Sequence, residues 1–506
     1  MVAMSSSTLA GTPATTKTSP STPATTVTDG HGWSGRTWLL LVVLCGALFL
    51  DGLDISMVGV ALPSIGADLG MSASALQWIV SGYVLGYGGL LLLGGRSADL
   101  LGRRRVFLTA VLAFGLASVA SALLSSPELI VALRFVKGLA AAFTVPAGLS
   151  IITTTFEEGP ARNKALSIYT VCGASGFSLG LVLGGVLTEL GWRATFLLPG
   201  PVALLLVVVG LRVIPVSQRT VSRFSEFDLP GALTSTGALL LFVVGVVESP
   251  ARGWTDPVVL GLFAAAVVLG AAFVAIELRH SSPLVRLGIL RSRHLRHANL
   301  AGAVMAGCYF SFQFLVTLYL QDSLGWSPLA MAMGFLPAGL LVMASSTVMD
   351  RVLARVGTQP LIAGGMVAFL AAYLLFLRVD PSTGYVALLF PTMLLLGVGF
   401  ALAFPAINAQ ATAGVADHEQ GLASGLVNTS VQIGGAVVLA VVSAILGSAA
   451  RSEGPAQPGE LLPGMVDGLQ VIVGLTVVGV LAAGVALARR APAAVESGLT
   501  EPAEAA

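Results

Sequence analysis

The chain has 506 residues, of which 55% are hydrophobic and only 10% are charged, and its mean hydropathy is +0.90. Soluble domains carry about 25% charged residues, so this composition excludes an ordinary soluble protein and predicts one that lies in a lipid bilayer. The net charge of +1 says little by itself, because the positions of the charges relative to the apolar segments decide their meaning.

The first 36 residues are mostly Ser, Thr, Pro, Ala and Gly, a composition that cannot form a hydrophobic core. We expect a disordered cytoplasmic tail over 1–36 and a second one over the alanine- and glutamate-rich end, 489–506. The start lacks the basic region, short apolar core and cleavage site of a signal peptide, so the first apolar segment is expected to be a retained helix.

A helix needs about 20 mostly apolar residues to cross a bilayer, and fourteen stretches of the chain meet this requirement. The expected spans are 37–62, 76–95, 106–124, 129–153, 165–188, 193–214, 229–248, 257–277, 299–320, 328–349, 359–378, 384–410, 421–447 and 468–488. Most of the loops between them are short, so neighbouring spans should run antiparallel. The predicted fold class is an all-α polytopic membrane protein.

The basic residues predict the orientation. If the N-terminus lies in the cytoplasm and the chain crosses fourteen times, twenty of the 26 lysines and arginines fall on the cytoplasmic side, four fall outside and two lie within a span. Cytoplasmic loops of membrane proteins carry such an excess. We therefore expect a bacterial inner-membrane protein with both termini in the cytoplasm.

Two pairs of acidic positions suggest an internal repeat. Asp99 and Asp350 lie in similar loops, 251 residues apart, and Asp68 and Asp322 follow the first and ninth spans, 254 residues apart. Repeated six-span halves are common in transporters. The expected parts are a first six-helix bundle, two inserted helices, a basic cytoplasmic linker and a second six-helix bundle, at 37–214, 229–277, 278–298 and 299–488.

Four charges lie inside apolar spans. Asp51 and Asp54 are in the first span, and Arg134 and Lys137 are in the fourth. Residues three apart share a face of a helix, and a charge in the middle of a bilayer costs about 2.5–3.5 kcal/mol even on insertion scales. At ~1.5 Å per residue, the depths of the two pairs overlap. We expect Asp54 to pair with Arg134 or Lys137, and Asp51 to be partly unpaired near a central cavity.

Such a cluster is suited to proton coupling. An apolar medium favours the neutral form of a carboxyl group and a nearby cation favours its charged form, so a rearrangement can load or release a proton. Arginine does not release its proton at accessible pH, which leaves Asp51, Asp54 and Lys137 as candidate carriers. The alternative is a static neutral cluster that fixes the first and fourth helices together.

The fifth span carries a ridge of glycines, Gly176, Gly180 and Gly184, with Gly185 beside it. Such ridges let helix backbones approach closely, and packing of this kind serves gating if the helix lies between the two halves.

The second half has uncharged polar residues within its spans. They are Tyr309, Gln313, Asn408, Asn428 and Gln432. Together with nearby phenylalanines they could line a cavity for a bulky, largely apolar ligand that needs a few hydrogen bonds. For each residue alone, bonding between helices is the alternative.

The sequence contains no GxxxxGK[ST] phosphate loop, no HExxH pair and no GxSxG elbow. We therefore expect neither ATP-driven transport by this chain nor an enzyme, and no cofactor or metal site.

Several motifs resemble the major facilitator superfamily, and specifically its fourteen-span drug:proton antiporter group, the DHA2-like multidrug efflux transporters. GRSADLLGRRR resembles the loop after the second helix, which latches the cytoplasmic gate in the family. The matching positions with their basic neighbours are Gly95, Arg96, Asp99, Gly102, Arg103 and Arg104. LDISMVGVALPSI and RFVKGLAAAF resemble the first-helix and fourth-helix motifs, with the acidic position on Asp54 and the coupling arginine on Arg134.

GFSLGLVLGG, from Gly176 to Gly185, is similar to the antiporter motif of the fifth helix, although Leu181 stands where proline is usual. Lys137 stands where glutamine is common, and its extra charge favours an anionic or neutral substrate. The resemblance implies a fold of two six-helix bundles with two inserted helices.

We expect proton-coupled efflux of an amphipathic drug or secondary metabolite by alternating access. The alternatives are a transporter of lipids or lipophilic precursors on the same scaffold and, in another class, a membrane sensor or anchor that transports nothing. The expected partners are the small organic substrate, protons and the lipid bilayer, with no nucleic acid, and the chain is expected to be a monomer.

Overall fold

The computed structural model describes residues 33–157, 159–216, 228–280, 283–345, 348–382, 384–413, 415, 420–454 and 457–488. Within these residues the secondary structure is almost entirely helical. The elements are α1 (Gly35–Leu69), α2 (Ala73–Leu101), α3 (Arg103–Leu123), α4 (Pro127–Thr155), α5 (Pro160–Leu190), α6 (Arg193–Leu197), α7 (Pro199–Val213), α8 (Leu229–Arg252), α9 (Pro257–Arg279), the 3-10 turn η2 (Leu287–Arg291), α10 (Arg293–Leu318), the π turn η3 (Tyr319–Ser323), α11 (Pro328–Ser345), α12 (Met349–Val356), α13 (Thr358–Phe376), α14 (Leu389–Thr412), α15 (Gln420–Glu453) and α16 (Met465–Ala488).

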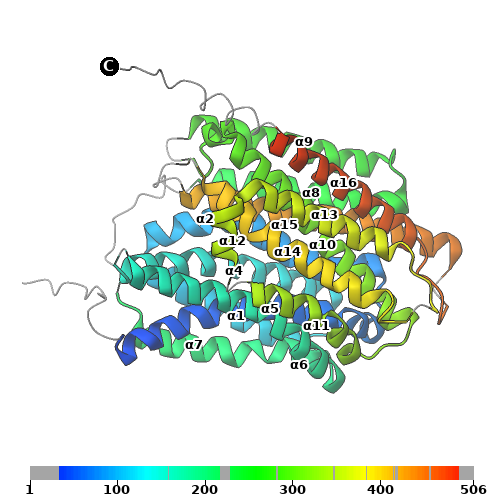
Figure 1. Ribbon diagram of the computed structural model, residues 1–506, viewed down its shortest axis with the longest axis horizontal. Helices are drawn as coiled ribbons and strands as arrows, with labels where there is room; N and C mark the ends of the chain where they lie inside the picture. Colours follow the sequence, from blue (N-terminus) through cyan, green and yellow to red (C-terminus); the bar gives the residue numbers. More distant parts are fainter. Residues whose placement is uncertain are drawn as a thin grey trace, which may run out of the picture.

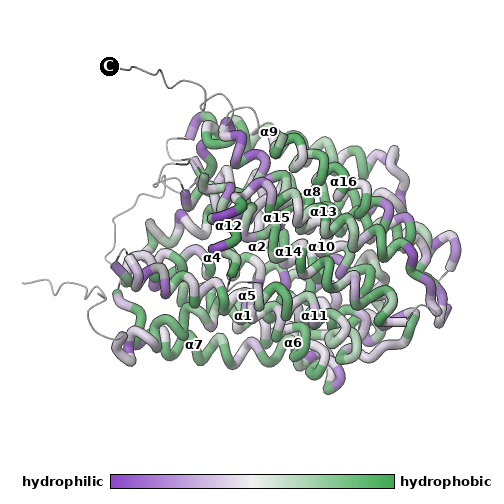
Figure 2. The backbone as a smooth tube through the Cα atoms, in the orientation of Figure 1, coloured by the Kyte–Doolittle hydropathy of each residue, from purple (hydrophilic) through white to green (hydrophobic). Residues whose placement is uncertain are grey.

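Fourteen helical spans among the described residues are long and apolar enough to cross a membrane. The predicted all-α, fourteen-span fold is confirmed, and the protein is a multi-pass membrane protein. Hydrophobic residues fill the middle of the helices, whereas hydrophilic ones gather toward the two ends of the bundle (Figure 2). Because the number of crossings is even, α1 begins and α16 ends at the same end of the bundle, on the left in Figure 1.

The first six and the last six spans pack in the same order. In the first group α1 packs on α5, α2 on α4, and α3 on both α4 and α7. In the last group α10 packs on α15, α11 on α14, and α13 on both α14 and α16. The two groups meet along two seams, α2 against α15 and α5 against α11. This is the packing of a duplicated six-helix unit.

The two inserted helices lie outside this core. α8 packs against both α2 and α15, so it covers the seam between the two groups, and α9 packs against α8. In Figure 1 α9 lies at the edge of the bundle. The buried residues of α9 are Val259, Ala266 and Glu277.

Several boundaries differ from the sequence prediction. α1 starts at Gly35, inside the expected tail, because Ser34 caps it by accepting a bond of 3.2 Å from the Thr37 N–H. It runs on to Leu69 instead of 62, so both aspartates lie near its middle rather than toward its outer end. The remainder of the expected tails, 1–32 and 489–506, lies outside the described residues.

Other differences concern the expected linker and loops. Helical structure covers most of the expected linker 278–298, since α9 ends at Arg279, η2 follows and α10 begins at Arg293. The sixth span consists of two helices, α6 and α7, which meet at Leu198 before Pro199. The loop after the tenth span contains the short helix α12.

The end of the bundle away from α1's start is closed by contacts between the two groups. Gln321 Nε2 donates to Val60 O at 2.9 Å, and Ser443 Oγ donates to Ala73 O at 3.4 Å. A Cβ added to Gly185 of α5 would lie 2.7 Å from Leu329 Cα of α11, so these backbones nearly touch. The structure is therefore that of a state closed at this end.

Candidate functional site: a buried charge network

Asp54 of α1 lies between the two basic residues of α4. One of its carboxylate oxygens forms an ion pair with Arg134 and the other with Lys137. The structure thus joins Asp54 to both cations, where the sequence predicted one. Asp54 and Lys137 are fully buried, and 2% of the Arg134 side chain is exposed.

Burial at this level makes further hydrogen bonds necessary, because the Coulomb attraction of a buried pair offsets its desolvation only if the remaining donors are satisfied. Arg134 Nε donates to Ile79 O of α2 at 2.9 Å. Lys137 Nζ donates to Ser118 Oγ of α3 at 3.0 Å, and Ser118 Oγ donates to Phe196 O of α6 at 2.7 Å. The network therefore ties five helices of the first group together.

Aromatic rings complete the surroundings of the two cations. The Arg134 guanidinium lies 4.5 Å from the centroid of the Tyr83 ring. Lys137 Nζ lies 4.7 Å from that of Phe114 and 5.4 Å from that of Phe196. Such contacts stabilise a desolvated cation where water is excluded.

Asp51, one turn before Asp54, has a different partner. The Tyr83 hydroxyl of α2 donates a hydrogen bond to Asp51 Oδ1. Among the described residues Asp51 forms no ion pair, and it is 8% exposed whereas Asp54 is fully buried. Asp51 therefore lacks a cation, and a phenol binds one of its oxygens. Tyr83 was not among the predicted site residues.

Close packing of α2 on α4 brings Tyr83 into reach. A Cβ on Gly138 of α4 would lie 2.0 Å from Tyr83 O, and one on Gly86 of α2 would lie 2.4 Å from Phe135 O. Only glycine permits backbones to approach so closely. The SGYVLGYGG stretch of α2 carries this signal, because its glycines recur at helical spacing around Tyr83.

The glycine ridge of α5 packs mainly within the first group. Added Cβ atoms at Gly176, Gly180 and Gly184 would meet the backbone of α1 at 2.3–2.8 Å. Gly185 instead faces α11 in the last group. The ridge therefore seats α1, the helix that carries both aspartates, and only the adjacent Gly185 lies at the interface between the groups.

The loop between α2 and α3 is reduced to Gly102, whose φ of +95° lies in the region that favours glycine. Gly95 lies against Pro146 of α4, because a Cβ added to Gly95 would lie 3.7 Å from the Pro146 Cβ. Arg96 is exposed and Arg103 is half-buried. Arg104 donates to Leu211 O of α7. The side chain of Asp99 lies outside the described part of the structure.

The five polar residues of the last group do not share one environment. Tyr309 packs in an aromatic cluster, 5.5 Å from Phe400 and 6.4 Å from Phe369 between ring centroids. Gln432 is buried in the seam, where it contacts Gly88 of α2.

Of the other three polar residues, one lies near a helix of the first group and two form hydrogen bonds within their own helices. Gln313 approaches Gly59 of α1, with 3.9 Å between its Nε2 and an added Cβ. Asn408 and Asn428 are half-buried, and each donates to the carbonyl four residues earlier in its own helix, at 2.9 and 3.0 Å.

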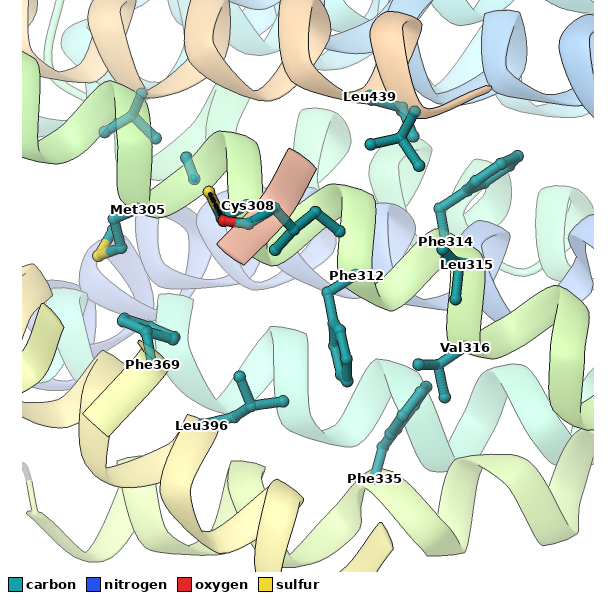
Figure 3. Packing of buried hydrophobic residues seen from close by; sticks show 14 of the residues in the cluster. Met305, Cys308, Phe312, Phe314, Leu315, Val316, Phe335, Phe369, Leu396 and Leu439 are labelled. Carbon is teal, nitrogen blue, oxygen red and sulfur yellow. Dashed lines mark hydrogen bonds between the residues drawn. The ribbon is translucent and has the colours of Figure 1, made fainter. Parts of the chain in front are cut away.

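The equivalent region of the last group is apolar. In Figure 3 Met305 and Phe312 of α10 point toward Phe369 of α13 and Leu396 of α14. All four side chains are buried. Among the described residues of α10 to α16, no charged side chain is buried, so the network belongs to one half of a duplicated fold.

Comparisons with known proteins agree with this architecture. The profile of the Major Facilitator Superfamily matches residues 44–439. The chain is 38% identical to the puromycin resistance protein pur8 of Streptomyces alboniger, over 88% of this chain and 90% of the relative. It is 34% identical to the cephamycin export protein CmcT of Amycolatopsis lactamdurans, over 81% and 85%.

Solved structures show the same fold. The peptide transporter PepTSo of the POT family superposes with a TM-score of 0.67 at 17% identity, covering 91% of this chain and 98% of that one. The nucleoside transporter NupG superposes with a TM-score of 0.59 at 13% identity, covering 89% and 99%. The protein is therefore a transporter and not an enzyme, and it belongs to the Major Facilitator Superfamily, in its fourteen-span drug-efflux group.

Proposed function

We propose that the protein exports an amphipathic organic compound, a drug or a secondary metabolite, in exchange for protons. Relatives named for resistance to and export of antibiotics support the substrate class. The observation that carries the coupling is the buried network in which Asp54 binds two cations while Asp51, a turn away, binds only a phenol.

The two aspartates have different parts in this mechanism. Asp54 is held as a carboxylate by two cations in a buried site, so it fixes Arg134 and Lys137. Asp51 has no cation in contact and is the more exposed of the two, so it is the proton carrier. When Asp51 is ionised the four charges sum to zero; when it binds a proton the network gains one positive charge.

This change of charge gives proton binding a means to shift the equilibrium between the two access states. A proton that enters from outside would bind Asp51 and disturb the Tyr83 contact, which lies between α1 and α2. Both helices take part in contacts with the last group, α1 through Val60 and α2 along the α15 seam. Each charge that crosses the potential contributes about 2.3 kcal/mol per 100 mV, and a tenfold substrate gradient costs about 1.4 kcal/mol.

We assign the substrate cavity to the interface between the two groups. Its polar wall would come from Tyr309, Gln313, Asn408, Asn428 and Gln432. Gln313 and Gln432 support this position, because both contact helices of the first group. Rotation of the groups would free amides that now bond locally.

The proposed membrane is the bacterial inner membrane, with both termini in the cytoplasm and the closed end facing outside. The excess of lysine and arginine in the loops on the same side of the membrane as the termini supports this orientation. The end of α2 around Asp99, with the start of α3, would then act as the cytoplasmic gate latch, and the protein would work as a monomer. We propose the division into bundles at 37–214 and 299–488, with the inserted pair at 229–277.

Substrate-driven proton movement in proteoliposomes tests the function. Puromycin is a suitable first probe, because one relative is named for resistance to it. The drug is added on the side with the lower proton concentration. The proton gradient should then collapse faster in vesicles that contain the protein than in empty ones. No acceleration across a panel of amphipathic antibiotics would refute the proposal, and transfer of labelled lipid in the same vesicles would favour the lipid transporter instead.

A further inference from the structure

A second pair of buried acids lies on the inserted helices, away from the charge network. Asp228 caps the start of α8, and Glu277 lies near the end of α9. Asp228 is fully buried and Glu277 is only 4% exposed. Buried carboxyl groups normally have a cation or several donors as partners.

Both acids hold the segment that follows α9. Asp228 accepts from the Gly231 N–H at 2.8 Å and from the Leu284 N–H at 3.4 Å. Glu277 Oε2 accepts from the Val285 N–H at 3.1 Å. Two consecutive amides of the connection between the inserted helices and the last group are therefore bound by two acids from different helices.

The partners of these acids leave one oxygen unsatisfied. The two carboxyl groups lie close together, because they bind the amides of two consecutive residues, and Glu277 Oε1 has no donor among the described residues. Neither acid forms an ion pair in the described part of the chain. This contrasts with Asp54, whose two oxygens each have a cation.

The described surroundings of the pair include one titratable side chain and apolar groups of α2. His280, at the end of α9, is a titratable neighbour of Glu277. From α2, Leu90 and Leu93 pack in the apolar cluster around Leu284 and carry no charge. Arg286 is the next charged residue along the segment and is exposed. Two carboxylates in contact at such a site repel strongly.

We propose that Asp228 and Glu277 share one bound proton, which makes this pair a second proton-binding site and fastens the segment at Leu284 and Val285 to the inserted helices. A proton between the two groups supplies the missing donor for Glu277 Oε1, as in carboxyl dyads that hold one proton between them. Loss of the shared proton leaves two buried negative charges that repel each other. Release of the segment then admits water, which relieves this repulsion.

The site is placed to affect the whole bundle. α8 packs on both α2 and α15, so it spans the seam between the two groups, and the fastened segment leads directly into η2 and α10. Proton binding at the inserted pair therefore couples to the connection between the groups. The site does not depend on the proposed transport mechanism, since it lies on other helices than the charge network.

Two measurements on the full-length protein test the proposal, with Glu277→Gln as the variant. Glutamine keeps the size and supplies the donor without a titrating proton. Glu248→Gln is the matched control, because Glu248 lies on α8 but is 42% exposed and pairs with Arg252. The first measurement is the infrared band of protonated carboxyl groups as a function of pH. The second is hydrogen exchange of peptides that contain the Leu284 and Val285 amides.

In the wild type the infrared spectrum should contain a protonated-carboxyl band that Glu277→Gln removes and the control retains. As the pH rises and this band disappears, the protection of the two amides should fall roughly two- to tenfold. This protection is corrected for the intrinsic pH dependence of exchange. In Glu277→Gln it should stay constant over the same pH range. An unchanged band in Glu277→Gln, or the same fall in protection in that variant, would overturn the proposal.

Discussion

Replacement of Asp54 by asparagine tests how the buried network stabilises the first helix group. The amide would leave Arg134 and Lys137 with no carboxylate in contact, at exposures of 2% and 0%. Removal of one partner of a buried ion pair costs about 3–5 kcal/mol, and the upper part of this range applies because one carboxylate serves two cations. The apparent melting temperature in detergent should fall by about 10 °C.

A compensated variant separates this effect from a general loss of packing. Asp54→Asn combined with Lys137→Met restores the balance of charge, and most of the lost stability should return, since apolar side chains replace buried ion pairs at little cost. Asp68→Asn, on the same helix, is the matched control: its ion pair with Arg193 is about half exposed, so its melting temperature should not change. Equal melting of Asp54→Asn and Asp68→Asn, or no rescue by the second substitution, would refute the reasoning.

Three further predictions concern the surroundings of the network. Tyr83→Phe removes the donor to Asp51, so coupled transport should fall roughly tenfold and its pH profile should shift while drug affinity stays unchanged; an unaltered pH profile would count against a role for the phenol. Gly138→Ala puts a Cβ 2.0 Å from a backbone oxygen and should cost about 1–3 kcal/mol in thermal denaturation, whereas Gly261→Ala, in open space, should melt like the wild type; similar melting of the two variants would contradict the packing argument. Gln321→Ala deletes a bond of 2.9 Å between the two groups and should raise the labelling rate of cysteines placed at the closed end; unchanged labelling would show that this bond does not hold the end shut.

The sequence predicted the features that depend on solvation. Charges within apolar stretches are rare enough that Asp51, Asp54, Arg134 and Lys137 could be singled out, and helical spacing placed each pair on one face. Fourteen apolar stretches were sufficient to count the spans. The bilayer imposes these patterns directly on the chain.

Features that depend on which helices touch could not be predicted. A tyrosine in an apolar helix is ordinary, and the glycines around Tyr83 do not tell which helix they face, so its role emerged only when α2 was seen against α4. The spacing of Gly176, Gly180 and Gly184 predicted a close approach, but the partner is α1 rather than the other half. Asp228 and Glu277 are far apart along the chain and near span ends, where acids are common, so only the fold shows that they bind consecutive amides of one segment.

The central claim is that Asp51 carries the proton that drives transport, and Asp51→Asn in proteoliposomes tests it most directly. The variant should bind drug and exchange labelled for unlabelled drug as fast as the wild type, because this exchange needs no net proton movement. A proton gradient should no longer drive its accumulation of drug. Gradient-driven accumulation at the wild-type rate in Asp51→Asn would contradict the account.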